Sequence, residues 1–410
     1  MFKALRSRNF KLFFYGQSVS VIGTWLQKTA VSWMVYSITG SVFLLGLTTF
    51  LSMIPSLFLA PLAGSIIGRY NRHKSMMILQ SLAMLQAGAL ALLIYLKIYN
   101  ITFILILSLI QGIINAFDMT CRQTMMVDIV DNKEDLPNAV ALNSTLTNFA
   151  RIAGPALAGI ILHQYGEDIC FIGNFLSYIP VLISLALMKI QPYTKATNKL
   201  RMLDDFIEGL DYVKKENQMA KMLLMLTCSS LFVISFNTLM PVFAKDIFNG
   251  NAQTFSWFES AAGIGSIISA IYLANLKSSS NIDNIMIGAS ILLGASIVIL
   301  ALSNSLALTL ICMVLSGIGM MGQTSSINIY IQTKSTSHMR SRSISYYMMA
   351  YQGMIPVGSL IIGYISHSLG VRTTVAIQGV ICLISVVVYL YYKNLKSTEE
   401  LETCPVRYKN

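Results

Sequence analysis

Three ionisable residues stand inside long apolar stretches of this sequence and are the first candidates for chemistry. Lys28 and Arg151 each lie near the middle of such a stretch, and Glu259 lies early in another. A charge at membrane depth is costly unless water or an opposite charge receives it. These residues therefore indicate a polar route through an apolar protein.

A polar stripe surrounds Lys28. Steps of three or four residues place on one helix face Gln17, Ser20, Thr24, Lys28 and Ser32. Because a polar face against lipid is costly, we expect this face to line a central cavity, where Lys28 would meet an anionic group of a substrate. The neighbours predicted to contact the same substrate are Thr24, Trp25 and Gln27. The alternative is an acidic partner on another helix, or a side chain that snorkels outward.

The stretch around Arg151 has a similar face, which carries Ser144, Asn148, Arg151 and Pro155. Pro155 removes one backbone donor and bends the helix. Arg151 could hold a carboxylate or phosphate of the substrate through two parallel hydrogen bonds. A fixed ion pair with Asp118 or another carboxylate is the alternative. Together, Lys28 and Arg151 would make one half of the cavity cationic, which favours an acidic substrate.

Glu259 is the carboxylate that we place within the bilayer, and it is the first candidate to carry a proton. Its alternative is an exposed position at the outer end of its helix. Asp118 is the rival carrier. Its spacing to Arg122, four residues further on, favours a structural ion pair instead.

Composition places the chain in a membrane. Hydrophobic residues make up 55% of the 410 positions and charged residues only 11%, against about a quarter in soluble proteins. About twelve apolar stretches are long enough to span a bilayer. Most of the 29 Lys and Arg residues fall in alternate connecting segments, as cytoplasmic segments do. This asymmetry, and not nucleic-acid binding, accounts for the net charge of +11.

Enzyme and metal signatures are not found in the sequence. The six cysteines are scattered without a Cys-x-x-Cys pair, and only four histidines occur. We therefore expect no metal site, no disulfide framework and no cofactor. Motifs of a serine hydrolase, a zinc protease or a phosphate-binding loop are also missing, which argues against an enzyme and against self-contained ATP hydrolysis.

The two halves of the chain repeat each other. The segments 157–166 and 361–370 align at a separation of 204 residues, and His163 and His367 are among the identical positions. A duplication of six-helix halves is typical of carriers that rock one half against the other. The sequence predicts an all-α membrane protein with about twelve transmembrane helices in two pseudo-symmetric six-helix bundles and both termini cytoplasmic.

The predicted boundaries follow from this repeat. The first bundle covers residues 1–190, a cytoplasmic linker 191–218, the second bundle 219–393 and a cytoplasmic tail 394–410. An amphipathic helix is expected in the linker, with an apolar face made of Leu203, Phe206, Ile207, Leu210 and Val213. The further polar residues predicted to face the cavity are Gln111, Asn115, Asn148 and its repeat counterpart Gln352. Each is equally consistent with an interhelical hydrogen bond.

Four stretches of the chain match a known pattern. They begin with Gly23-Thr-Trp-Leu-Gln27, Pro61-Leu-Ala-Gly64, Asn115-Ala-Phe-Asp118 and Arg151-x-x-Gly154-Pro155. Taken together, they resemble the major facilitator superfamily, and within it the enterobactin-exporter-like and macrolide-efflux-like branch of transmembrane secretion effectors. The resemblance covers nearly the whole chain. It implies the two-bundle fold of that superfamily and secondary transport.

The resemblance also implies a cytoplasmic gate. The residues that match it here are Arg69, Arg72, Asp118 and Arg122. The family pattern has an acid before Arg69, and this chain has Gly68 there, so Asp118 or Asp128 would have to replace that acid. The proton-relay arginine of the efflux pattern is replaced by Ser108. Gly154-Pro155 resembles the motif that marks exporters, which implies antiport against protons.

The sequence therefore predicts an exporter in the bacterial inner (plasma) membrane that moves a small organic molecule by proton-coupled alternating access. The bases favour an anionic siderophore or a similar metabolite. A multidrug or macrolide-type efflux pump is one alternative, and an importer of siderophores or metabolites is another. A lipid flippase or a non-transporting sensor is a more distant one. The expected partners are the substrate, protons and membrane lipid, with the protein as a monomer.

Overall fold

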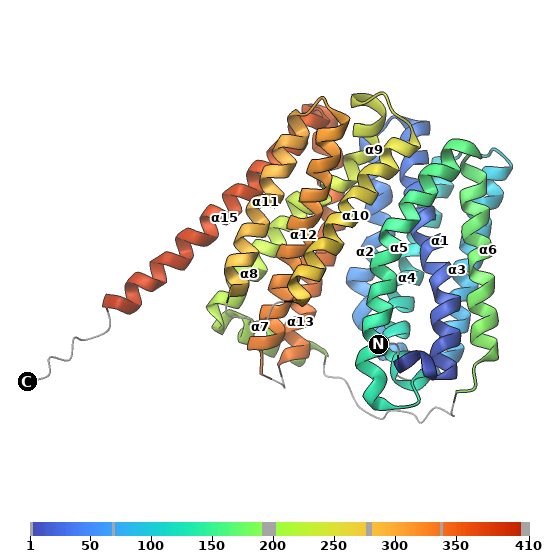
Figure 1. Ribbon diagram of the computed structural model, residues 1–410, viewed down its shortest axis with the longest axis horizontal. Coiled ribbons are helices and arrows are strands. Elements are labelled where there is room, and N and C mark those ends of the chain that lie inside the picture. The colour runs from blue at the N-terminus through green and yellow to red at the C-terminus, as the bar shows by residue number, and fades with distance from the viewer. Residues whose placement is uncertain (1–2, 68–69, 191–201, 276–280, 337–338, 403–410) are drawn as a thin grey trace, which may run out of the picture.

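The computed structural model of the chain is helical throughout the residues that it describes, which are 3–67, 70–190, 202–275, 281–336 and 339–402. The helices form two bundles that lie side by side (Figure 1). We call the face on which α1 begins, at the bottom of Figure 1, the lower face, and the opposite one the upper face. The lower face is the one predicted to be cytoplasmic.

The first bundle consists of six long helices. In chain order they are α1 (Arg8–Thr39), α2 (Val42–Ile67), α3 (Arg72–Tyr95), α4 (Ile101–Ile129), α5 (Leu136–Gln164) and α6 (Glu167–Leu187). Two short 3₁₀ turns, η1 (Lys3–Arg6) and η2 (Lys133–Asp135), lie at the lower face. The helix starts have local causes: Asn71 and Asn100 cap α3 and α4, because their side chains accept hydrogen bonds from free backbone amides.

The second bundle begins after α7 (Met202–Lys215) and is less regular. Its regular helices are α10 (Ala252–Ala274), α11 (Ile282–Leu302), α12 (Leu306–Lys334) and α15 (Val371–Glu402). The seventh crossing is assembled from α8 (Asn217–Cys228), η3 (Ser229–Val233), η4 (Ile234–Leu239), α9 (Met240–Val242) and η5 (Phe243–Ile247). The eleventh crossing is assembled from α13 (Arg340–Met348), η7 (Met349–Gly353) and α14 (Met354–Leu369). Of these pieces η3, η5 and η7 are π-helical and η4 is 3₁₀.

Membrane crossings follow from length and hydropathy. In the described part of the chain, eleven segments are long and apolar enough to span a bilayer. The helix α1 has 32 residues and is the twelfth long crossing, although its polar stripe keeps it out of that set. The predicted all-α, two-bundle fold is confirmed.

The packing repeats between the two bundles. The helix α2 packs against α4 as α10 packs against α12, and α3 packs against α6 as α11 packs against α15. The most extensive contacts between the bundles are those of α5 with α10 and of α2 with α14, and α1 adds smaller contacts with α9 and α10. Two helix pairs therefore form most of the interface between the bundles, and the space between these pairs is where a substrate route can lie.

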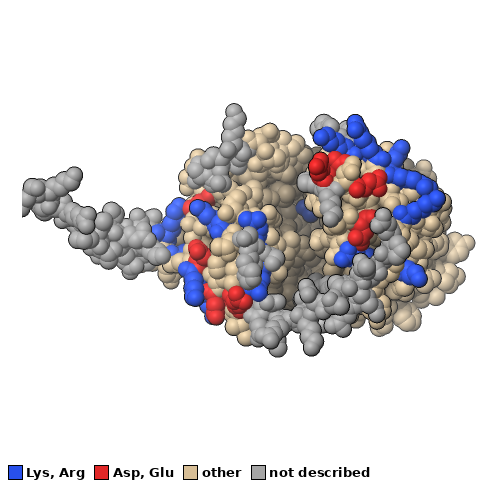
Figure 2. Space-filling view, turned by 90° about the horizontal axis from the view of Figure 1, so that it is seen from below, with Lys and Arg blue, Asp and Glu red and all other residues tan. Residues whose placement is uncertain are grey.

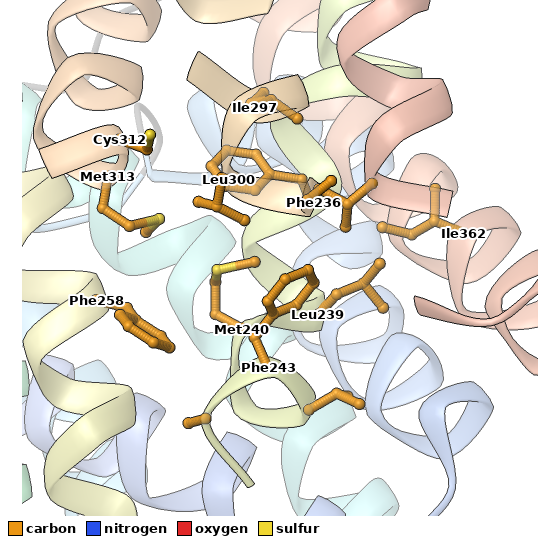
Figure 3. Close-up of a cluster of buried hydrophobic side chains, with 14 of the residues drawn as sticks. Phe236, Leu239, Met240, Phe243, Phe258, Ile297, Leu300, Cys312, Met313 and Ile362 are labelled. Carbon is orange, nitrogen blue, oxygen red and sulfur yellow. The ribbon is translucent and has the colours of Figure 1, made fainter. Parts of the chain in front are cut away.

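The largest apolar cluster lies mainly in the second bundle and extends to Tyr36, Val42 and Leu45 of the first (Figure 3). Phe236, Leu239, Met240 and Phe243 of the seventh crossing are buried there against α10, α11 and α12. Large side chains thus fill the space around the irregular crossing. Burying one such side chain fully contributes about 1.5–3 kcal/mol to the free energy of folding. The π and 3₁₀ turns of this crossing are therefore surrounded by well-packed apolar side chains.

The predicted amphipathic helix of the linker is present as α7, at the lower face (Figure 1). Val213 is buried against the second bundle, and Glu208 pairs with Arg342 of α13 at 2.7 Å. Ile207, which we assigned to the apolar face, is instead exposed. The remainder of the linker, 191–201, lies outside the described residues.

Candidate substrate site

A close crossing of α1 and α5 builds the site. Gly154 of α5 lies against Trp25 of α1: a Cβ atom at Gly154 would collide with the Trp25 Cβ and lie 3.1 Å from the backbone nitrogen of Leu26. Only a residue without a side chain permits this approach. The crossing brings Lys28 and Arg151, each three residues from its end of this contact, to the same place.

Both bases lie at the ring of Trp25. The Lys28 Nζ is 4.7 Å from the ring centroid and the Arg151 Cζ is 5.5 Å from it. Both distances are within the range of cation–π attraction. Neither base has an ion pair within 4 Å in the described part of the chain, and the Arg151 Nε is buried without a hydrogen-bond partner. The predicted alternative of an Arg151–Asp118 pair is absent there.

Lys28 faces the space between the bundles. Its side chain is exposed although it belongs to the middle of a 32-residue helix. It interacts electrostatically with Arg151 of its own bundle and with Glu259 of the other one. A side chain that faced lipid could not reach both, so the exposure is to a hollow. Figure 2 shows the lower face hollowed between the two bundles, with charged side chains on both rims.

Glu259 extends the site across the interface. It is half-buried on α10, and its Oε2 accepts a hydrogen bond of 2.5 Å from the Thr29 hydroxyl of α1. Thr29 directly follows Lys28, so a single turn of α1 contributes both the cation and the hydroxyl. Glu259 is therefore inside the protein at the bundle interface, and not at an exposed helix end.

Asp118 and Arg122 form a separate, buried network within the first bundle. Their ion pair is 2.5 Å long, and Gln80 donates to the same carboxylate at 2.6 Å. With its amide oxygen turned toward Arg122, Gln17 accepts from both terminal nitrogens of the guanidinium at 2.6 Å. A carboxylate held by two donors at once is a structural anchor, as the spacing to Arg122 favoured. Asp118 is not brought together with Lys28.

The predicted gate residues at the lower face are partly described. Arg72 pairs with Asp128 at 2.9 Å, which joins α3 to α4. Arg69 and Gly68 lie outside the described residues. Asp128 thus contacts the predicted gate through Arg72, whereas Asp118 and Arg122 lie deeper in the bundle.

Three other residues predicted to contact substrate hydrogen-bond to neighbouring polar side chains. Gln27 is buried between helices, where it accepts from Asn174 at 2.7 Å and donates to Gln86 at 3.3 Å. Gln111 donates to Asn115 on the same helix at 3.0 Å. Gln27 is therefore held within the first bundle, whereas Gln111 and Asn115 stay predicted cavity residues.

The remaining three predicted contacts are partly exposed. The Thr24 hydroxyl donates to its own helix, to the Ser20 carbonyl at 2.9 Å. Asn148 lies one turn from Arg151 on α5. Gln352 belongs to the π-helical η7, where its amide is 3.9 Å from the Met348 sulfur. Of the predicted set, the structure gathers Trp25, Lys28 and Arg151 around one point and adds Glu259.

The space between the bundles is closed toward the upper face by a seam that sequence reasoning missed. We define the seam by three contacts between α1 and the second bundle: Thr29 with Glu259, Trp33 stacked on Phe255 with centroids 6.4 Å apart, and Tyr36 donating to Asp246. A signal was present, since positions 29, 33 and 36 share one helix face. Lys245 adds a hydrogen bond of 3.1 Å to the Ser37 carbonyl.

Two six-helix bundles around a shared hollow define the class of carriers that work by alternating access. Solved transporters share the fold. The nucleoside transporter NupG superimposes with a TM-score of 0.71 at 17% identity, covering 94% of this chain and 98% of its own. A bacterial homologue of the iron transporter ferroportin gives 0.72 at 15% identity, with the same coverage.

The chain belongs to the transmembrane secretion effector family of the major facilitator superfamily, whose pattern matches residues 1–409. It is a multi-pass membrane protein and a secondary transporter, not an enzyme. It is 27% identical to the staphyloferrin A transporter of Staphylococcus aureus, over 96% of this chain and 98% of that one. It is 22% identical to macrolide efflux protein A of Streptococcus pyogenes, over 92% and 95%.

Proposed function

We propose that this transporter exports a small anionic metabolite, of the siderophore kind, across the bacterial inner membrane by proton-coupled alternating access. The observation that carries the proposal is the pair of bases at Trp25, neither of which has an ion pair within 4 Å in the described part of the chain. Because a charge inside a membrane protein is costly unless balanced, an anion is the substrate that this site fits. The likeness to a staphyloferrin A transporter supports the same substrate class.

Glu259 is the proposed proton site. It is the carboxylate that interacts with Lys28, and it joins the bundles through Thr29. A proton there changes both the charge of the site and a contact between the bundles, which is what coupling requires. Asp118 is a poorer carrier, because Arg122 and Gln80 already hold it.

A macrolide-type or multidrug pump is the second candidate, and the likeness to macrolide efflux protein A favours it. The two bases argue against it, because they disfavour cationic drugs and give nothing to uncharged ones. The proposed site would be expected to discriminate by charge, whereas a broad drug site would not.

A complementation experiment tests the proposal. A strain that lacks the gene is grown under iron limitation, and secreted and retained iron-binding acids are measured by mass spectrometry. We expect retention in the deletion strain and rescue by the wild-type chain. Lys28→Gln and Arg151→Gln should each reduce secretion about ten- to a hundredfold, as expected for losing a hydrogen bond to a charged group. Lys11→Gln is the matched control, since Lys11 is exposed near the start of α1.

The alternatives give different outcomes. Secretion that is unchanged, with poorer growth on supplied ferric siderophore, would identify an importer. Equal losses for anionic and cationic compounds in the Lys28 and Arg151 variants would remove the argument from charge and favour a drug pump.

A further inference from the structure

The charges around Glu259 form a closed set. The groups that face it are Lys28 from α1 and, through Lys28, Arg151 from α5. Its neighbour on α1 is the neutral Thr29. The next charged side chains of the interface, Lys245 and Asp246, are engaged with Ser37 and Tyr36 toward the upper face. Among the described residues, we therefore take Lys28, Arg151 and Glu259 as the groups that set the charge of the site.

The sum of these three charges determines which anion charge neutralises the site. Two cations and an ionised Glu259 leave one positive charge, which a monoanion balances. If Glu259 holds a proton, two positive charges remain, and a dianion balances them. Because an unbalanced charge is costly once the site is closed off from water, the state of Glu259 selects between the two kinds of anion. Conversely, a second negative charge on the substrate favours the protonated carboxyl beside it.

On the basis of the proposed anion site, we propose that Glu259 takes up one proton when a dianion binds between Lys28 and Arg151, so that dianion and proton occupy the site together. The proton comes from solvent and forms the O–H bond of the Glu259 carboxyl, and no bond of the substrate changes. This differs from the antiport that the family resemblance implies, in which proton and substrate exclude each other from the carrier.

The same proton acts on the seam. The bond from Thr29 to an ionised carboxylate is charge-assisted, and such bonds are roughly twice as strong as neutral ones. Protonation of Glu259 therefore weakens a contact that holds the bundles together near the hollow. The site with both dianion and proton is neutral and has the looser seam, whereas a site with only one of them is charged. Passage between the two open forms is thus favoured when both are bound.

This arrangement also sets the electrical sign of transport. One dianion with one proton moves a net single negative charge across the membrane per cycle. A membrane potential that is negative inside favours the outward direction for that charge. Export would therefore draw on the potential, whereas the accompanying proton moves out against an inward proton gradient and offsets part of that drive.

Calorimetry on the full chain in lipid nanodiscs tests the inference, with benzenedisulfonate and benzenesulfonate as probes. Both sulfonates stay ionised between about pH 5.5 and pH 7.5, so any proton taken up belongs to the protein. Titrations in two buffers of different ionisation enthalpy count the protons. We expect about one proton per disulfonate and an affinity that rises up to tenfold per unit fall in pH. Benzenesulfonate should take up far less.

Variants locate the proton. Glu259→Gln should bind benzenedisulfonate with its low-pH affinity at every pH and without proton uptake. Glu167→Gln, at the start of α6 and remote from Glu259, should behave as the wild type. Thermal unfolding checks that each variant is folded, and the wild-type proton count needs no variant. Equal uptake for the two sulfonates, no uptake, or uptake that survives Glu259→Gln would each overturn the inference.

The proposed function fails in a different way. If neither sulfonate binds the wild-type chain, or if Lys28→Gln leaves both affinities unchanged, the anion site itself is wrong. If binding depends on Lys28 but no proton is taken up, the anion site is supported. Only the inference that dianion and proton bind together would then be wrong.

Discussion

The two bundles share a packing plan but differ in charge and in regularity. In the first bundle, α1 and α5 are α-helical from end to end and carry Lys28 and Arg151. In the second, the corresponding seventh and eleventh crossings contain π and 3₁₀ turns. At the separation of 204 residues, the counterpart of Arg151 is the apolar Ile355. The duplicated halves have therefore taken on different tasks.

This difference has a physical basis. Two cations at one aromatic ring must be held in a fixed geometry, and regular helices provide it. Departures from the α-helix change which side chains face a neighbour, and π-helical turns are frequent at functional sites. In the proposed function, the first bundle thus positions the bases that bind the substrate. The second contributes the acids of the seam, Glu259 and Asp246, and crossings whose turns can change.

Gly154 and Gly358, again 204 residues apart, offer the sharpest test of the shared plan. A Cβ at Gly358 would overlap the backbone carbonyl oxygen of Leu231 in η3, deeper than the overlap of Gly154 with Trp25. Backbone cannot move aside as a side chain can. We expect Gly358→Ala to lower the free energy of unfolding by about 1–3 kcal/mol or more, and Gly154→Ala to lower it less. Thermal unfolding in detergent measures both.

Binding should rank the two variants in the opposite order. Gly154→Ala displaces Trp25, so it should weaken benzenedisulfonate binding more than Gly358→Ala does. Gly173→Ala is a suitable control, because a Cβ there meets no atom within 4 Å. Equal losses of binding in the two glycine variants would show that the site does not belong to the first bundle alone.

The sequence was sufficient to predict the fold and the residues at its centre. Charges in apolar stretches pointed to Lys28, Arg151 and Glu259, and their role in transport stays a prediction. The repeat predicted two halves, and the structure has two bundles, with eleven described segments apolar enough to span a bilayer and α1 as a further long helix. These inferences rest on local composition and periodicity, which a sequence displays directly.

Contacts between the bundles could not be predicted in the same way. The face of α1 that meets the second bundle is decided by tertiary packing, so Thr29 and Tyr36 were missed. We predicted that Gln27 contacts substrate. In the structure its side chain is instead buried between helices, where it hydrogen-bonds to Gln86 and Asn174. The π turns also have no signal here, because the residues of η3, Ser229–Val233, are ordinary helix residues.

The seam gives the next prediction, with a matched control in the chain. Tyr36 donates to Asp246 across the bundles, and Tyr389 donates to Asp283 at 2.5 Å within the second bundle. Tyr36→Phe removes a hydrogen bond to a carboxylate, which is worth about 1.5–3 kcal/mol, and only in the form closed at the upper face. We expect the population to shift toward the form open there. Tyr389→Phe should leave the balance unchanged.

Amide hydrogen exchange followed by mass spectrometry reads this shift. In Tyr36→Phe, exchange should become faster at the upper ends of α1 and α10 and slower around the hollow of the lower face. Faster exchange at the upper face without slower exchange at the lower face would mean local loosening, and the seam would not hold the bundles closed.

The smallest effect is expected at the lower rim, where each bundle has a partly exposed ion pair. Arg72 and Asp128 are 2.9 Å apart with side chains 26% and 31% exposed, and Arg342 and Glu208 are 2.7 Å apart. Exposed pairs typically contribute about 0.2–1 kcal/mol. Double-mutant cycles with Arg72→Gln and Asp128→Asn, and with Arg342→Gln and Glu208→Gln, should give coupling energies in that range for both bundles. A clearly larger coupling at Arg72 alone would mean that Asp128 has taken over the clamp of the acid that Gly68 replaces, and the two rims would then differ as the two sites do.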